Sequence, residues 1–477
     1  MTEEQNNKDQ SPENNPESKV NTGNANDAPS ISRRNVLKFG ALGAAGAALG
    51  GGVGYLAHSK LKGTPMKDIR PPDQISKDFK PKDQRDVVLG FATSKKLNEK
   101  HPERNETYNK VTGKNFNFYE GAVGFEKGPY RNEPGYTQLD RALADAGWHP
   151  CKHTTPGMEF CQPNSGLFSW DQSGVVETQY QFETKEEASL KIKSAARIFG
   201  VSRCGITRRD RRWDYDPLYD ILNEKELSWD KDFPFEPKTV IVLLTDMDYL
   251  SMSTAPSWSE TGTVGDGYSE MSKVSSQMAE FIRKLGYHAV AAGNDLGLSV
   301  PYAMMAGLGE GARNGCLIAP GMGPRLRICK VYTDFEFVEY DQPRNFGVLD
   351  FCSRCMRCAE SCPSKAITFE DEPTMGPTYS DDPDYTWNSH PGIMKFHNDP
   401  KKCFNFWIEN DGDCGNCICS CPYNKPDFWH HRLVDASNVL VPGFVHSIMK
   451  QFDIIFGYGN VSDPKALKKL WESGKEL

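Results

Sequence analysis

The chain reads Cys352-Ser-Arg-Cys355-Met-Arg-Cys358-Ala-Glu-Ser-Cys362-Pro363 near its C-terminal end. A second stretch has Cys403 and then Cys414-Gly-Asn-Cys417-Ile-Cys419-Ser-Cys421-Pro422. The first stretch has the spacing C-x2-C-x2-C-x3-C-P, in which three thiolates hold one [4Fe–4S] cube and the fourth reaches a second cube. The second stretch repeats the C-x2-C-x3-C-P ending with one ligand moved upstream. Together they predict a two-cluster ferredoxin-like module and a protein that moves single electrons.

The spacing also assigns each cysteine to a cluster, because a tight loop can place three thiolates on one cube while the cysteine before proline leaves the loop. Cluster one takes Cys352, Cys355, Cys358 and Cys421. Cluster two takes Cys362, Cys403, Cys414 and Cys417. Cys419 interrupts the pattern and is left spare. Zinc ribbons and disulfides are the alternatives, but a ribbon uses two C-x2-C pairs and four ligands, whereas eight cysteines here match two cubes.

The length and charge of the chain limit its organisation and its partners. The 477 residues are enough for two or three domains with sizeable cores. A net charge of −8 argues against non-specific binding to nucleic acid, which requires a basic surface. We divide the chain into a leader and signal (1–59), an N-terminal wrapping region (60–185), an α/β core (186–340), the ferredoxin module (341–430) and a C-terminal tail (431–477).

The N-terminus has the features of a targeting segment. Residues 1–30 are polar and are expected to be disordered. They precede Ser32-Arg33-Arg34-Asn35-Val36-Leu37-Lys38, a twin-arginine signature, and then a Gly- and Ala-rich stretch to residue 57. Ala57-His58-Ser59 offers a cleavage site. An uncleaved anchor and a chance arginine pair are the alternatives. Export in the folded state suits a protein whose clusters must be inserted in the reducing cytoplasm, and no later stretch predicts a membrane span.

Strands and helices alternate between about residues 186 and 335, which predicts an α/β or α+β core. The segment 186–199 predicts a helix capped by Gly200, and 238–245 a strand buried on both faces. The clearest amphipathic helix covers 271–285, after a Ser- and Gly-containing loop. Residues 60–130 read as an arm with little regular structure, and 139–146 as a short helix that ends at Gly147.

Several electron-acceptor motifs are missing from the sequence. It has no C-x-x-C-H for covalent haem, no P-loop, and no Asp-x-His-x-x-Gly motif that would give a histidine to a corrinoid cobalt. The glycine-rich segment 307–315 follows a predicted helix instead of a strand, so a Rossmann interpretation is weak.

The chain resembles the respiratory reductive dehalogenases. The resemblance rests on the twin-arginine leader, on Gly267-Tyr268-Ser269, on the segment from Asn294 to Gly315 and on both cysteine stretches, and it covers about residues 139–430. The Gly-Leu-Gly-x-x-x-x-Asn-Gly region is shared with the epoxyqueuosine reductases, which act on tRNA, but those enzymes predict a basic surface and no leader. A non-enzymatic exported electron carrier is the third alternative.

This resemblance implies an α+β fold in which a nitroreductase-like core holds a corrinoid without a protein histidine on cobalt. The glycines that would let the backbone approach the macrocycle are Gly293, Gly297, Gly307, Gly309, Gly311 and Gly315, and the alternative is that they are turn and cap glycines. Tyr268 matches the proton donor of the family, Arg313 a basic residue beside that tyrosine, and Asn294 a polar neighbour. The alternatives are a loop aromatic for Tyr268 and a surface ion pair for Arg313. Trp407 either lines the substrate pocket or packs against cluster two.

The resemblance also implies an activity and partners. The activity is reductive cleavage of a carbon–halogen bond in a small organohalide, fed by the two clusters. The partners are a small integral-membrane anchor protein and a membrane electron donor, at the outer face of the cytoplasmic membrane, with no role for nucleic acid.

Overall fold

The computed structural model describes residues 63–113, 130–131, 133–154, 174–220, 224–426 and 457–476. The predicted leader and twin-arginine signal lie outside these residues. Among the described residues, no helix has both the length and the apolar character needed to cross a membrane. The domain boundaries set from the sequence stay predictions.

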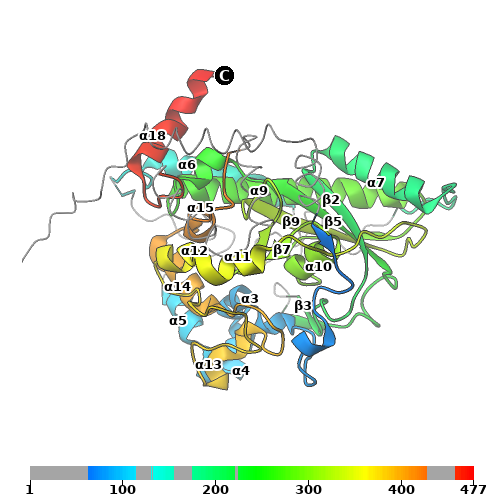
Figure 1. Ribbon diagram of the computed structural model, residues 1–477, viewed down its shortest axis with the longest axis horizontal. Coiled ribbons are helices and arrows are strands. Elements are labelled where there is room, and N and C mark those ends of the chain that lie inside the picture. The colour runs from blue at the N-terminus through cyan, green and yellow to red at the C-terminus, as the bar shows by residue number, and fades with distance from the viewer. Residues whose placement is uncertain are drawn as a thin grey trace, which may run out of the picture. The chain divides into compact units, whose positions relative to one another are not determined.

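A four-stranded sheet forms the centre of the core (Figure 1). Its strand order is β2 (Arg203–Arg208), β5 (Thr239–Asp246), β9 (Leu326–Thr333) and β6 (Ala289–Ala292), and every neighbouring pair is antiparallel. Seven of the eight residues of β5 are buried, because helices or loops cover both faces of this strand. An antiparallel sheet packed with helices is an α+β arrangement, so this part of the predicted fold class is confirmed.

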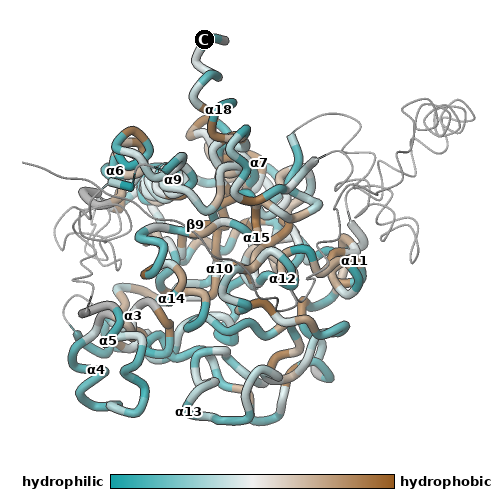
Figure 2. Tube along the Cα trace, turned by 90° about the vertical axis from the view of Figure 1, so that its left-hand side faces the viewer, coloured by the Kyte–Doolittle hydropathy of each residue, from teal (hydrophilic) through white to brown (hydrophobic). Residues whose placement is uncertain are grey.

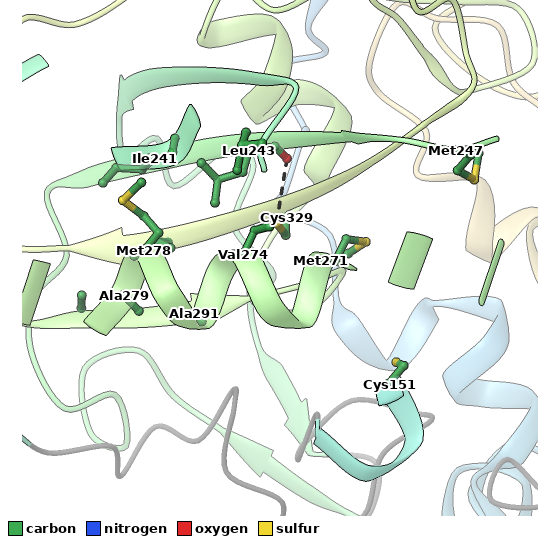
Figure 3. Packing of buried hydrophobic residues seen from close by; sticks show 14 of the residues in the cluster. Cys151, Ile241, Leu243, Met247, Met271, Val274, Met278, Ala279, Ala291 and Cys329 are labelled. Atoms are coloured by element: carbon green, nitrogen blue, oxygen red, sulfur yellow. Dashed lines mark hydrogen bonds between the residues drawn. The ribbon is translucent and has the colours of Figure 1, made fainter. Parts of the chain in front are cut away.

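Helix α9 (Trp258–Lys284) lies along one face of this sheet together with α7 (Lys185–Phe199). Figure 3 shows its apolar side chains, such as Met271 and Val274, against Leu243 and Cys329 of the strands. The opposite face packs against α10 (Ser299–Met305). Figure 2 shows the hydrophobic segments gathered in the interior around β9, and hydrophilic ones on outlying helices such as α4 and α13. Helix α7 ends as predicted, at Gly200 with a φ of 97°.

Helix α9 begins 13 residues earlier than the sequence predicted, so the expected loop before Met271 is wrong. Its N-cap is Ser257, whose hydroxyl accepts a hydrogen bond from Glu260 N. Gly262, Gly265 and Gly267 weaken the intrinsic helix propensity of this first half. Tertiary packing overrides that weakness, and Tyr268 therefore lies inside a helix.

The glycines of α9 allow α6 (Gln138–Thr154) to approach very closely. A Cβ on Gly265 would lie 2.4 Å from the Trp148 ring, and one on Gly147 would lie 2.1 Å from Gly262 O. Helix α6 runs through Gly147 and Pro150 instead of ending at Gly147 as predicted. The hydroxyl of Ser269 donates to Gly147 O and accepts from Cys151 N, and so bridges the helix around the proline.

Replacing Gly265 with alanine should destabilise the protein by about 1–3 kcal/mol, because the new methyl group overpacks the contact with Trp148. The gain in helix propensity, about 1 kcal/mol, is smaller than this cost. Asp266→Ala is the matched control, since its side chain is the exposed neighbour on the same helix. Thermal unfolding of the two variants checks the prediction, and an equal melting temperature would contradict the proposed close packing.

The N-terminal arm carries more regular structure than predicted. It contains α3 (Val88–Thr93), α4 (Lys95–Lys100) and α5 (Glu106–Gly113), which are short helices without a long apolar period. The short strands are β1 (Thr64–Pro65), β3 (Leu218–Asp220), β4 (Lys225–Leu227), β7 (Glu310–Gly311), β8 (Leu317–Ile318) and β10 (Arg344–Asn345). Strand β1 pairs with β10, which ties the arm to the segment before the cysteines.

The cysteine-bearing segments form short helices. These are α11 (Val348–Cys355), α12 (Arg357–Ser361), α14 (Pro400–Asn410) and α15 (Asn416–Cys419). Helix α13 (Pro383–Thr386) lies in the segment that connects the two cysteine stretches, and α18 (Pro464–Glu472) lies near the C-terminus. Helices α12 and α15 lie against each other, and the hydroxyls of Ser361 and Ser420 are 2.7 Å apart. The two cysteine stretches therefore pack as a pair, as a two-cluster module requires.

Candidate active site and cluster-binding cysteines

The four cysteines assigned to cluster one line a common pocket. Cys352 and Cys355 lie on α11 and Cys358 on α12, and Cys421 follows α15. Met356, with a φ of 56°, turns the chain between the first two helices so that three cysteines can face one space. Burial raises the pKa of the Cys352 thiol to about 12. Thiolates at such a site need a strongly cationic partner, which iron provides.

The cysteines assigned to cluster two also lie near one another. Cys403 is exposed as a residue, but loss of hydration around its thiol, and then the neighbouring Cys362, raise the pKa of that thiol to about 12. Burial also raises the pKa of the Cys414 thiol, and the neighbouring Cys403 and Cys362 raise it further. The pKa of the Cys417 thiol is raised mainly by a hydrogen bond with Cys316. The sequence did not place Cys316 here, because it lies outside both cysteine stretches.

Cys419 points away from both groups. Its buried thiol donates to Ser253 O at 3.9 Å and to Asn460 O at 3.7 Å. The structure thus gives Cys419 backbone partners of its own and makes it a natural control for the cluster ligands.

Tyr268 and Asn294 come together although 26 residues separate them. Asn294 follows β6, which lies beside α9, and its Nδ2 donates to the Tyr268 hydroxyl at 2.8 Å. Trp148 of α6 stacks on the tyrosine ring with the centroids 4.9 Å apart. Tyr268 is half-buried and Asn294 is exposed, so the pair borders accessible space. A tyrosine held in this way can present a proton to a small molecule.

The cation beside Tyr268 is Arg327, so the prediction that Arg313 takes this place is wrong. The Arg327 guanidinium lies over the tyrosine ring, 4.6 Å from its centroid. Gly267 leaves room for it, because a Cβ there would lie 2.9 Å from Arg327 Cγ. Arg327 comes from β9, and the packing of α9 against β9 brings it to the tyrosine. The sequence offered no local signal for this contact.

Arg313 lies in a different place because its loop turns towards the cysteines assigned to cluster one. Its guanidinium donates to Cys352 O at 2.8 and 3.1 Å and to Thr368 O at 2.8 Å. It also lines the pocket of the cluster-one cysteines. The surface ion pair considered from the sequence is wrong too, since Arg313 is completely buried.

Burial raises the pKa of Tyr268 above its ordinary value of 10.0. Arg327 opposes this shift by stabilising the tyrosinate, and Asn294 opposes it less by hydrogen bonding. The hydroxyl therefore keeps its proton at neutral pH. The same cation would stabilise the anion that remains after the proton is given away.

Two buried carboxylates lie near this site and were not predicted from the sequence. Glu260 is fully buried and neither of its oxygens has a hydrogen-bond partner. Burial, and to a smaller extent Asp413, raise its pKa well above the usual range. The positive charge of Arg327 opposes this rise only in part. Burial raises the pKa of Asp413, which precedes Cys414, to about 7. The charges of Glu260, Asp413 and Arg327 thus act on one another, and Glu260 also acts on Cys414 of the cluster-two segment.

The glycines proposed to line a macrocycle divide into two groups. At Gly297, Gly307 and Gly309 a Cβ would lie 2.5, 2.4 and 2.4 Å from Tyr332 Oη, Gln342 O and Ile318 O, respectively. The packing of the protein itself therefore requires glycine at these three positions. Gly311 and Gly315 have no such close contact, and Gly293 is held through its carbonyl by Lys330 Nζ at 2.6 Å. A cofactor role for all six stays a prediction.

Trp407 lies on α14 and contacts Phe404 edge-on, with the ring centroids 5.8 Å apart. It packs at the border of the same hydrophobic core that Tyr268 borders. Its assignment to a substrate pocket is not decided by these contacts and stays a prediction.

The comparisons with known proteins agree on one family. Residues 351–425 match the family model of the 4Fe-4S dicluster domain. The chain is 34% identical over 395 residues to a tetrachloroethene reductive dehalogenase of Desulfitobacterium hafniense, covering 70% of each chain. It is 31% identical to the enzyme of the same name from Sulfurospirillum multivorans, over 68% of this chain and 69% of that one.

A solved reductive dehalogenase, described as supporting a mechanism for B12-dependent dehalogenation, superposes with a TM-score of 0.60. The identity is 19%, and the match covers 84% of this chain and 49% of that protein. This chain therefore spans about half of the solved protein, and the likeness concerns the fold. From the sequence similarity to the tetrachloroethene enzymes, the chain belongs to the reductive dehalogenase family of oxidoreductases.

Proposed function

We propose that this protein removes halide from a small organohalide by reductive cleavage of a carbon–halogen bond. The observation that carries the proposal is the placement of a proton-bearing tyrosine next to a cluster-binding segment. Arg327 lies over Tyr268, and its positive charge also lowers the pKa of the Cys316 thiol, which hydrogen-bonds Cys417. Reductive dehalogenation needs two electrons and one proton at the same carbon, and this arrangement brings the two supplies together.

Two [4Fe–4S] clusters would be held by the eight assigned cysteines, cluster one in the pocket of Cys352, Cys355, Cys358 and Cys421. The donor set fits, because all eight ligands are thiols and those of cluster one share one space. Bound clusters of this type supply single electrons at potentials down to about −700 mV.

We propose that the core, which we take to be nitroreductase-like, binds a corrinoid, and its buried polar groups support this. Trp213 Nε1 and both amide atoms of Asn388 are buried without a hydrogen-bond partner in the described structure. Trp213 O accepts from Leu298 N beside Gly297, in the glycine-rich segment. A ligand rich in amide groups would satisfy such atoms. A corrinoid, when bound, supplies the low-potential cobalt chemistry that breaks the bond.

The residues of this chain would manage the proton. Tyr268 gives its hydroxyl proton to the substrate carbon from which halide departs, and Asn294 fixes the direction of the hydroxyl through its 2.8 Å hydrogen bond. Arg327 stabilises the tyrosinate until a proton returns. The balance is one carbon–halogen bond broken, one carbon–hydrogen bond formed, two electrons and one proton consumed, and one halide released.

Arg327→Met should raise the pKa of Tyr268 further, since it removes the cation that opposes the effect of burial. The tyrosine then becomes a weaker acid, and we expect kcat to fall by up to about tenfold for each unit of the rise. The alkaline limit of the rate, which reports loss of the donor proton, should move to higher pH. Arg211→Met, at an exposed ion pair with Asp230, is the control. A pH profile of kcat that is the same in both variants would contradict the role of Arg327.

We also propose export by the twin-arginine route and a peripheral position at the outer face of the cytoplasmic membrane. The support is the Arg33-Arg34 signature and the family resemblance. A small integral-membrane anchor protein and a membrane electron donor are the expected partners.

The direct test is release of halide by the anoxically purified holoenzyme with a reduced low-potential dye. Chlorinated ethenes come first because the sequence relatives are named tetrachloroethene reductive dehalogenases. Chlorinated ethanes and aromatics follow. Halide release that requires both dye and enzyme supports the proposal, and no release from any of these classes by cofactor-loaded enzyme would contradict it.

A further inference from the structure

Arg313 is a buried cation at the cluster-one pocket. It has no exposed surface, and its guanidinium lies 4.2 Å from the centroid of the Phe396 ring. Its hydrogen bonds go to the backbone oxygens of Cys352 and Thr368. All these partners are neutral, so none of them balances the positive charge.

No carboxylate of the described residues lies within ion-pair distance of Arg313. Glu310, three residues earlier, accepts hydrogen bonds from the backbone N–H groups of Phe346, Val348 and Leu349 at the start of α11. An isolated buried charge is costly unless an opposite charge is near. The opposite charge available to Arg313 is the cluster itself, because four thiolates make a [4Fe–4S] centre anionic.

The loop that carries Arg313 also contacts the cysteines assigned to cluster two, through the neutral side chains of Asn314 and Cys316. Asn314 Nδ2 donates to Cys417 O at 3.3 Å, and Cys316 hydrogen-bonds the Cys417 thiol. One short loop of the core thus touches both cluster-binding segments and brings its cation only to the first.

We infer that Arg313 raises the reduction potential of cluster one and so makes it a better electron acceptor. The reason is electrostatic: a one-electron reduction adds negative charge to the cluster, and a nearby buried cation stabilises the reduced form with little screening by water. The inference rests on the proposed occupation of these sites by [4Fe–4S] clusters. It makes Arg313 a positioning and tuning residue for electron transfer instead of a partner of Tyr268.

The test is a redox titration of anoxically purified holoenzyme, in which the reduced clusters are followed by electron paramagnetic resonance. Arg313→Gln removes the charge and keeps a hydrogen-bond donor. We expect the equilibrium constant for reduction of one cluster to fall at least about tenfold, which is 59 mV for a one-electron couple. The other cluster should not shift. Arg313→Lys should retain most of the wild-type potential. Arg354→Gln is the matched control, since it removes the same charge from an exposed position on α11.

Each outcome decides the question. A shift in Arg313→Gln that Arg313→Lys reverses and Arg354→Gln does not reproduce supports the inference. Unchanged potentials in Arg313→Gln, or an equal shift in Arg354→Gln, overturn it. If Arg313→Gln loses iron, the iron content of Arg313→Lys decides the question. Retention of about eight irons in Arg313→Lys supports the inference that the positive charge is needed, and loss of iron in Arg313→Lys overturns it. Shifted potentials in a protein that releases no halide would contradict the proposed function and leave this inference standing.

Discussion

Replacing Tyr268 with phenylalanine should lower kcat by about 10²- to 10⁴-fold, the usual contribution of a positioned general acid. Phenylalanine keeps the stacking on Trp148 and the contact with Arg327, because both involve the ring. The proton and the hydrogen bond from Asn294 are lost. Steady-state halide release measures the effect, and KM should change much less than kcat.

The control for this variant is Tyr287→Phe, at a hydroxyl that donates to Tyr180 O away from the site. Both variants should contain the same amounts of iron and cobalt. If Tyr268→Phe turned over as fast as Tyr287→Phe, the proton would have to come from another group, and the proposed role of Tyr268 would be wrong.

Removing a ligand of cluster two should abolish electron delivery. In Cys414→Ala we expect iron to fall from about eight to about four atoms per chain, because a four-iron cube needs its full set of thiolates. Halide release should fall below detection. We choose Cys414 over Cys417 because the Cys316 thiol lies next to Cys417 and could replace it as a ligand.

Cys419→Ala is a close control, five positions away in the same stretch. Its thiol contacts backbone oxygens and belongs to neither group of cluster cysteines. Full iron content and activity are expected. Equal loss of iron in the two variants would overturn the cluster assignment.

The cysteine sites could be predicted from sequence because their geometry is largely local. A C-x2-C-x2-C spacing fixes the shape of a loop, so Cys352, Cys355 and Cys358 were grouped without knowledge of the fold. The β5 strand was equally clear, since its apolar residues form one continuous run. Tyr268 and Asn294 were paired only through the family resemblance, and the structure brings them together.

Non-local contacts account for what the sequence missed. Arg327 reaches Tyr268 because α9 packs against β9, and no spacing rule in the sequence reports such packing. Arg313 was placed wrongly because its loop turns to Cys352. The first half of α9 was read as a loop because glycines lower helix propensity locally, whereas here they are required for contact with α6.

The most direct test of the account is the content of cobalt, iron and acid-labile sulfide in protein purified without oxygen. The account predicts about eight irons per chain, from two four-iron clusters, together with a corrinoid cobalt equimolar with the chain. About eight irons without cobalt, even after refolding with cobalamin, would contradict it and would leave an electron carrier in place of a dehalogenase.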